Sequence, residues 1–197
     1  MCPRRRLPTL LSGLALLAGL SGCGVTTGGS GAEGSQRTAA DTEGTYLVFP
    51  HDLTYQIQIS RYLNPADPED RSYVQGLRAG SPPLAPDEQW FVVFIRVSNE
   101  TKQPHLAAAD FRMVDAQGTS YQPVPLDGGL NSFAYQASTL APNDVVPPPA
   151  SAAAENTIQG SELLFRIRRD FFFNRPVVFR ITSPVNPQLT READIDV

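Results

Sequence analysis

Two histidines are the first candidates for catalysis, because a histidine can act as a general base near neutral pH. His51 follows a proline at the predicted edge of a strand, and His105 follows Pro104 in a predicted turn. A hydrolytic triad needs a histidine beside a nucleophile and a carboxylate. The chain contains no G-x-S-x-G, S-x-x-K or H-E-x-x-H motif. We therefore expect no catalytic residue and predict that the protein is not an enzyme.

Possible metal ligands are poorly spaced. Acidic groups occur at 67–70 and 194–196, but neither has the spacing of a calcium-binding loop. We expect a solvated loop at the first and a frayed tail at the second. Met113 alternates into a predicted strand, so we expect it in the core and not at a copper site. Asn99 begins an N-E-T sequence and is expected to form a turn. We predict no metal and no cofactor.

Three consecutive phenylalanines are the feature most open to a binding role. Neighbouring side chains in a strand point to opposite faces, so the three rings cannot all enter one core. They could plug the open end of a β-sandwich, or they could form an exposed contact for a protein, glycan or membrane partner. Nearby arginines make the local charge positive, which suits an anionic surface or pairing with Asp170. The six candidate contact residues are Phe171, Phe172, Phe173, Arg168, Arg169 and Arg175.

Cys23 is the residue whose chemistry its surroundings define best. Three arginines at 4–6 precede an apolar run from Leu7 to Leu20. This run fits the core of a signal peptide and is too short to span a bilayer. The residues Leu20-Ser21-Gly22-Cys23 resemble the lipobox of bacterial lipoproteins. The resemblance implies that a diacylglycerol is attached to the Cys23 thiol and that a peptidase cuts before it. An ordinary secretory signal with an incidental cysteine is the alternative.

Removal of this leader changes the charge and the cysteine content. Residues 1–22 hold three arginines and no acidic residue, so a chain beginning at Cys23 has 175 residues and a net charge of −7. Such a chain has no basic face for nucleic acid. With Cys2 removed and Cys23 lipidated, no disulfide is possible. We predict a protein held by lipid at the extracytoplasmic face of the cell membrane.

The composition changes sharply after the leader. Residues 24–45 are small and polar, which is typical of a flexible linker. Aromatic and β-branched residues then dominate. We predict a signal peptide at 1–22, the lipidated cysteine and linker at 23–45, a β-sandwich at 46–184 and a C-terminal tail at 185–197.

Alternation of apolar and polar residues predicts the strands. Residues 53–60 alternate perfectly, which indicates a half-buried strand. Residues 90–98 are apolar on both faces, which indicates a central strand. Further strands are expected at 111–114, 119–121, 163–167 and 177–181, with a possible helical turn at 151–155. About seven short strands separated by turns favour an all-β fold, an antiparallel β-sandwich.

The order of these segments resembles a known domain. A strand ending in V-S-N-E-T is followed by D-F-R-M-V-D-A-Q-G-T-S-Y, a proline-rich loop, G-S-E-L-L-F-R-I and R-P-V-V-F-R-I. This pattern is similar to the immunoglobulin-like accessory domain of Gram-positive, often actinobacterial, lipoproteins. It spans roughly residues 50–183 and implies an immunoglobulin-like sandwich without catalytic residues. The loop at 126–159 is longer than in that family. The matching positions are Asn99, Asp110, Phe111, Met113, Val114, Asp115, Gly118 and Tyr121.

Two functions follow from these patterns. The first is a non-enzymatic, lipid-anchored module that binds an exported protein through a sheet edge or through the segment at 168–175. The alternative is a module that binds a small molecule or a cell-wall polymer at one end of the sandwich. Protruding phenylalanine rings would favour the first function, and rings lining a hollow would favour the second.

Overall fold

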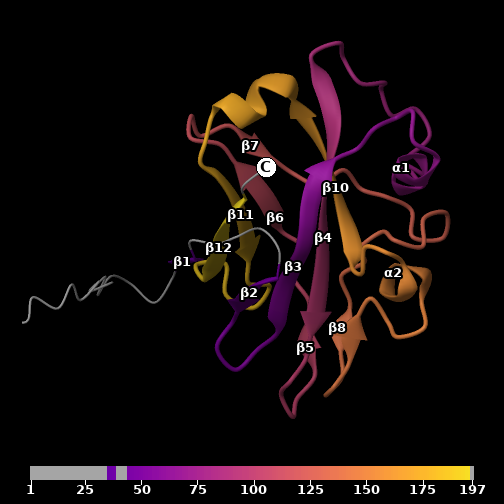
Figure 1. The fold of residues 1–197 in the computed structure, drawn as a ribbon. Coiled ribbons are helices and arrows are strands. Elements are labelled where there is room, and N and C mark those ends of the chain that lie inside the picture. The colour runs from indigo at the N-terminus through magenta and orange to yellow at the C-terminus, as the bar shows by residue number, and fades with distance from the viewer. Residues whose placement is uncertain (1–34, 39–43, 196–197) are drawn as a thin grey trace, which may run out of the picture. The chain divides into compact units, whose positions relative to one another are not determined.

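The computed structural model describes residues 35–38 and 44–195. The predicted signal peptide, Cys23 and most of the predicted linker lie outside the described residues. Within them the chain forms two main β-sheets, which pack face to face (Figure 1). The prediction of an all-β sandwich is confirmed.

The first sheet has five strands in the order β1-β12-β11-β6-β7. Its bounds are β1 Ser35–Thr38, β12 Thr190–Ile195, β11 Val177–Thr182, β6 Phe111–Val114 and β7 Ser120–Tyr121. The second sheet has the order β10-β4-β3-β2, and β9 also pairs with β4. Its bounds are β10 Ser161–Arg168, β4 Glu88–Ser98, β3 Thr54–Tyr62, β2 Thr45–Val48 and β9 Val145–Val146. A separate short pair joins β5 His105–Leu106 to β8 Thr139–Leu140.

The inner core fills the space between the two sheets. Alternate residues of β4, Phe91, Val93 and Ile95, face it from the second sheet, and Phe179 faces it from β11. The phenylalanine rings of this core are fully buried. Period-two alternation therefore identified the faces correctly for these strands.

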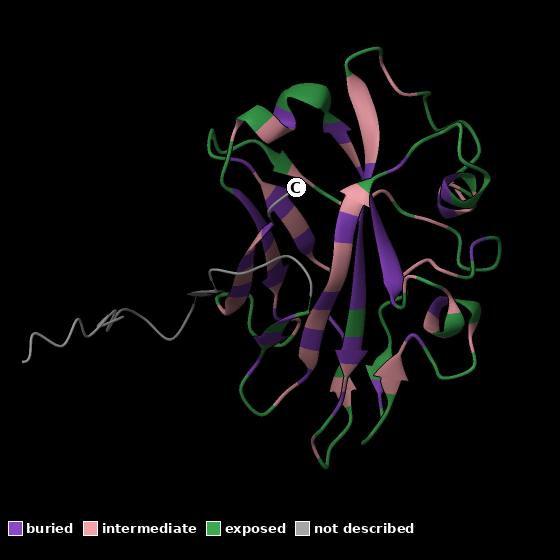
Figure 2. Cartoon of the chain, viewed as in Figure 1, coloured by how far each residue is buried: buried purple, intermediate pink, exposed green. Residues whose placement is uncertain are grey.

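An outer core covers the opposite face of the second sheet. Val92 and Phe94 of β4 and Leu164 of β10 point into it, which explains why β4 is apolar on both faces. Its cover consists of α1 (Pro68–Tyr73), the segment at 122–137 and the region after α2 (Ala152–Glu155). In Figure 1 both helices lie on the side of this sheet away from β11 and β12, and Figure 2 shows β4 and β10 buried for most of their length.

Four predictions about individual segments are wrong or incomplete. The predicted tail at 185–197 contains β12, whose Ala193 and Ile195 enter the inner core because they alternate with half-buried polar residues that point to the other face. Part of the predicted linker, 35–38, forms β1, which pairs with β12 in parallel and not antiparallel. The predicted loop at 67–70 begins α1, with Asp67 as its N-cap. The long loop at 126–159 contains β8, β9 and α2, so the strands exceed seven.

Candidate functional site

The three phenylalanines lie in the connection between the strands predicted at 163–167 and 177–181. They end a five-residue 3-10 helix, η1 (Arg169–Phe173), which carries the chain from β10 in the second sheet to β11 in the first. A 3-10 helix has three residues per turn, so successive side chains point about 120° apart. The three rings therefore enter three different environments, which alternation between two strand faces cannot produce.

Phe171 is the plug that one reading of the sequence predicted. Its ring is fully buried in the inner core and packs edge-on against Tyr121, with 5.1 Å between ring centroids. Phe172 is half-buried and lies against Tyr62 at 4.3 Å and Phe91 at 5.6 Å. These contacts fix the short helix to the end of the sandwich.

Phe173 points away from the protein and is 88% exposed. Together with Phe172, Tyr62 and Arg175 it forms a surface that we call the η1 face. Tyr62 is itself 38% exposed, and the Nε atom of Arg175 donates a hydrogen bond to the Phe172 carbonyl at 3.3 Å. Phe173 thus protrudes from a helix that is fixed by the packing of Phe171 and Phe172, which suits a residue that contacts a binding partner.

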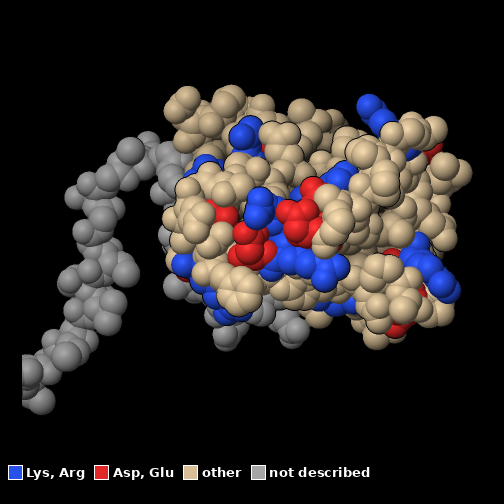
Figure 3. Space-filling model, turned by 90° about the horizontal axis from the view of Figure 1, so that it is seen from above, with Lys and Arg blue, Asp and Glu red and all other residues tan. Residues whose placement is uncertain are grey.

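The charge around η1 is mixed. Arg168 donates two hydrogen bonds to Asp170, at 3.0 and 2.9 Å, so the charge of Arg168 is balanced locally. The hydrogen bonds from Arg168 hold the pKa of the Asp170 carboxyl below its ordinary value. Figure 3, which looks down on this end of the molecule, shows arginine and acidic side chains side by side. Of the two alternatives for Arg168, pairing with Asp170 is the one observed, and the expected excess of positive charge is reduced.

The strand registers place the start of β1 at the other end of the sandwich. Val177 follows η1 closely and pairs with Ile195, whereas Thr182 pairs with Thr190. Ser35 is in turn the partner of Thr190. The described chain thus begins at the end opposite the η1 face.

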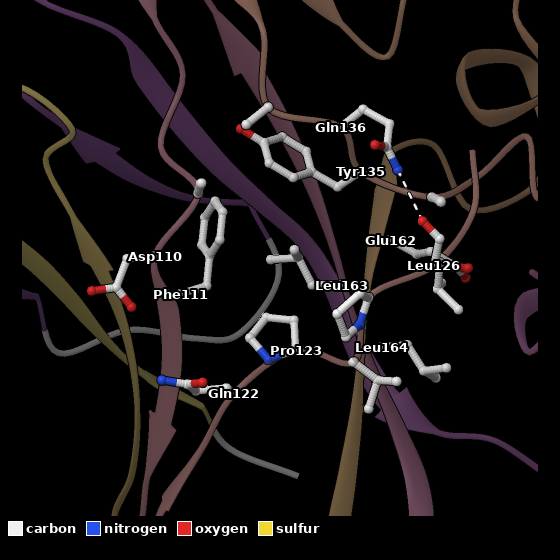
Figure 4. A pocket seen from close by; sticks show the side chains of 15 residues that line it. Asp110, Phe111, Gln122, Pro123, Leu126, Tyr135, Gln136, Glu162, Leu163 and Leu164 are labelled. Atoms are coloured by element: carbon white, nitrogen blue, oxygen red, sulfur yellow. Dashed lines mark hydrogen bonds between the residues drawn. The ribbon is translucent and has the colours of Figure 1, made fainter. Parts of the chain in front are cut away.

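A second candidate site is a hollow of about 470 Å³ beside β10, which we call the side groove. Four segments line it: 109–111, 122–126, 134–137 and 162–164. In Figure 4, Pro123 and Leu163 lie between Phe111 on one side and Leu126 on the other. The side groove lies along β10, an edge strand of the second sheet, whereas the alternative function predicted a binding site at one end of the sandwich.

Backbone hydrogen bonds hold both walls of the side groove against β10. The Val124 amide donates to the Leu164 carbonyl at 2.7 Å, and the Tyr135 amide donates to the Glu162 carbonyl at 2.9 Å. The Tyr135 hydroxyl donates to the Ala108 carbonyl at 2.8 Å. Gln136 then joins the walls, because its Nε2 atom donates to the Leu126 carbonyl at 3.3 Å. The hollow is therefore formed before any ligand enters.

Glu162 lies under the segment at 122–137 with its carboxyl group buried. Its Oε1 atom accepts a hydrogen bond from the Asn131 side chain at 2.6 Å, while Oε2 has no hydrogen-bond partner in the described part of the chain. Burial raises the pKa of this carboxyl to about 8, and the bond from Asn131 offsets only part of that rise. Glu162 is therefore mostly protonated at neutral pH.

The other residues singled out from the sequence have structural positions. His105 Nδ1 lies 3.2 Å from Asp52 Oδ1, and His51 occupies a turn with φ of 58°. Asn99 forms a turn, because its Oδ1 atom accepts from the Thr101 amide at 2.9 Å. Met113 is fully buried in the inner core, which confirms the core prediction.

Neither metal ligands nor a spanning helix are found in the described ranges. Over 35–38 and 44–195, histidine, cysteine and acidic side chains form no group of three or more that could hold a metal ion. In the same ranges, no helix has both the length and the hydropathy needed to cross a bilayer.

The side groove had only a weak signal in the sequence. Pro123-Val124-Pro125 predicts a rigid, donor-poor segment, but nothing local indicates that residues 134–137 lie opposite it. The burial of Glu162 also had no local signal, since a glutamate within an apolar strand usually marks its exposed face.

No known protein family matches the sequence, and no curated protein is significantly similar to it. Several solved structures have a similar arrangement of strands. One is a predicted lipoprotein, ycdA, of Bacillus subtilis subsp. subtilis str. 168, with 16% identity over 78% of this chain and a TM-score of 0.45. The present chain spans only 39% of ycdA.

Two others are matched over nearly their whole length. The yjhA protein of Bacillus subtilis has 11% identity over 80% of this chain and 100% of its own, with a TM-score of 0.49. An uncharacterised β-sandwich protein of Clostridium difficile 630 has 14% identity over 81% of this chain and 97% of its own, with a TM-score of 0.42.

Proposed function

We propose that this protein is a lipid-anchored, extracytoplasmic binding module that contacts another exported protein through its η1 face and has no enzymatic activity. The observation that carries the proposal is Phe173, an aromatic ring 88% exposed on a short helix whose Phe171 ring is fully buried. Exposing such a ring to water is unfavourable, and the buried Phe171 holds η1 in the position from which Phe173 points outward.

The residue types of the η1 face support a protein partner. Phenylalanine, tyrosine and arginine are enriched at protein interfaces, where tyrosine and arginine are among the residues that contribute most of the binding free energy. Phe173 would enter a pocket of the partner, while Tyr62 and Arg175 would surround it with groups that can form hydrogen bonds. The mixed charge around Arg168 and Asp170 fits a polar rim better than a surface for an anionic polymer.

The position of the predicted anchor also favours a protein over the anchoring bilayer. β1 begins at the end of the sandwich opposite η1. A fully extended chain from Cys23 to Ser35 spans at most about 40 Å. The eleven residues of β4 alone extend about 35 Å. The η1 face could touch the anchoring membrane only if that chain ran along nearly the whole domain.

The resemblance to an immunoglobulin-like accessory domain is consistent with the same role. The segment that carries the resemblance, Asp110 to Tyr121, contains the paired strands β6 and β7. Met113 and Phe111 point from it into the inner core, as a structural motif requires. We propose that the domain is an accessory module of this immunoglobulin-like kind.

Site-specific photocrosslinking in intact cells tests the η1 face. A benzoyl-phenylalanine placed at Phe173 should give one discrete adduct with an exported protein. The matched control is the same probe at Val185, which is 72% exposed but lies beyond β11 at the other end of the sandwich. Equal adducts at both positions, or adducts with lipid alone, would contradict the proposal.

Metabolic labelling tests the anchor independently. With an alkynyl palmitate as the label, the wild-type protein should carry the label on Cys23, and Cys23→Ser should lose it. Mass spectrometry of the N-terminal peptide should show a diacylglyceryl cysteine as the first residue. An N-terminus without this mass would defeat the lipid anchor while leaving the η1 face to its own test.

A further inference from the structure

The side groove exists because small side chains line it. Ala109 lies in the lining segment at 109–111, and Ala134 and Ala137 lie in the segment at 134–137. A larger side chain at any of them would fill space that is now open. The volume of the side groove, about 470 Å³, lies in the range of pockets that bind small molecules.

The wall at 123–125 offers carbon surface and no hydrogen-bond donor from the backbone. Pro123 and Pro125 have no amide hydrogen. The amide between them, that of Val124, is used by the Leu164 carbonyl. Leu126 and Leu163 continue this apolar surface across the floor. This side therefore offers a ligand carbon surface and carbonyl oxygens, but no free amide hydrogen.

The side groove offers no positive charge. None of the described residues that line it is Lys or Arg. Asp110 is the carboxylate at its rim, and it is already paired with Arg112 at 3.1 Å. Glu162 turns its buried carboxyl toward Asn131. A phosphate or carboxylate ligand would lose its hydration here without gaining a partner cation.

The polar groups that remain at the rim are uncharged. Gln122 and Gln136 are exposed and carry carboxamides, which can both donate and accept hydrogen bonds. Nε2 of Gln136 is held by Leu126, which leaves its oxygen as the acceptor for a ligand. These groups suit a hydroxyl or an amide.

We propose that the side groove binds a neutral small molecule that has an apolar body and an uncharged hydrogen-bonding head, such as a hydroxyl or an amide. The apolar body lies along Pro123, Pro125 and Leu163, and the head lies at the rim beside Gln122 and Gln136. Since the walls are already joined to β10 and to each other, binding costs little rearrangement.

Photoaffinity labelling of the intact, lipid-anchored protein tests this site. The probe is a long-chain alcohol carrying a diazirine, and peptide mapping shows where it attaches. Labelling should concentrate in 122–126 and 134–137. Ala137→Trp should reduce it there about tenfold, and so should Ala109→Trp in the lining segment at 109–111. The control Ala116→Trp, in the exposed turn between β6 and β7, should leave it unchanged.

The outcomes separate the parts of the proposal. Labelling confined to other segments, or labelling of 122–137 that survives both groove-filling variants, would overturn the site. A fatty acid or alkyl phosphate probe that labels as strongly as the alcohol would overturn the neutral chemistry. Competition by an apolar peptide but not by the free alcohol would overturn the small-molecule class. Melting temperatures near that of the wild type would show that the variants are folded.

Discussion

The inner and outer cores lie on opposite faces of the same strand, β4, yet they are built in different ways. The inner core joins two sheets through alternate strand residues, and its members are aromatic or aliphatic. The hydroxyls of the buried Tyr55 and the half-buried Tyr135 both form hydrogen bonds with the backbone of Ala108. The outer core is closed by one short helix and by loops, and it includes buried polar groups such as Glu162 and Asn131.

The two cores differ in how the backbone hydrogen-bonding groups around them are satisfied. Strand alternation buries apolar side chains while the ladders satisfy the backbone, so the inner core needs few special contacts. A loop packed on a sheet has no ladder and must satisfy its backbone in other ways. Asn131 does this: its side chain donates to the carbonyls of Tyr73 and Gln75 and accepts from the Phe133 amide. The outer core thus depends on a few polar contacts.

The largest loss of stability is expected from the inner core. Phe179 is fully buried and stacks on Phe111 with 5.9 Å between centroids. Phe179→Ala should lower the free energy of unfolding by about 3–5 kcal/mol, because it removes apolar contacts and leaves a cavity. Guanidinium denaturation measures this change. Phe173→Ala is the matched control and should change stability by less than about 0.5 kcal/mol; similar losses in both would break the distinction between core and surface.

The outer core should make stability depend on pH. The ordinary pKa of Glu162 is 4.5, and burial raises it to about 8 in the folded protein. Between these values the unfolded chain releases the proton while the folded chain keeps it, so stability falls as pH rises through the window and levels off above about 8. We expect a total loss of up to about 3 kcal/mol, because local opening of the outer core caps the cost of ionisation.

Glu162→Gln separates this effect from general alkaline sensitivity. The glutamine can still accept the hydrogen bond from Asn131, and it cannot ionise. Urea denaturation at pH 5 and pH 8 should give a smaller stability difference for the variant than for the wild type. The nearby Tyr73 hydroxyl, whose pKa burial raises to about 12, does not titrate in this window. Equal pH slopes in both proteins would show that Glu162 is ionised in the fold.

Asn131→Ala should have the next largest effect. The substitution leaves the Tyr73 and Gln75 carbonyls, Glu162 Oε1 and the Phe133 amide without this partner. The expected loss is about 2 kcal/mol, since buried groups left without partners cost more than the bonds themselves contribute. Thermal unfolding measures it. Ser132→Ala alters the exposed neighbour and should be nearly neutral; a comparable loss there would indicate a general loop effect.

The inner core was largely predictable from the sequence, because the pattern that indicates it involves only neighbouring residues. Alternation at 53–60 and 90–98 depends only on neighbouring residues, and the structure has β3 and β4 there. The strand at 190–195 was missed because it has few apolar residues and three of its six residues are charged. Its assignment needs β11 beside it, which no local pattern provides.

The candidate sites were only partly predictable. The phenylalanine run was recognised, but its division into buried, half-buried and exposed rings required the 3-10 geometry of η1. The side groove and the outer core depend on contacts such as that between Gly76 and Asp127, where a Cβ atom would lie 2.8 Å from the Asp127 carbonyl oxygen. Such close approaches join segments about fifty residues apart, and alternation carries no information about them.

The smallest expected effect concerns α1, which closes the outer core. The Asp67 side chain accepts a hydrogen bond from the Glu69 amide at 2.8 Å and caps this helix. Asp67→Ala should cost about 1 kcal/mol, the usual value of an N-cap. Because α1 carries Tyr73 into the outer core, loosening its first turn should open that core locally before the whole domain unfolds.

Hydrogen exchange distinguishes local opening from global unfolding. In Asp67→Ala the backbone amides of Phe133 and Glu162, which belong to the outer-core region, should exchange faster. The exchange rate of the Phe179 amide in the inner core should rise only as much as the loss of global stability requires. Ser151→Ala removes the corresponding N-cap of α2 and is the matched control. Its effect on these amides should be smaller, because α1 carries the fully buried Tyr73 whereas α2 buries only Ala153. An equal increase in the exchange rates of outer-core and inner-core amides would mean that the two cores unfold as one unit. The two cores would then differ in the way they are built but not in their stability.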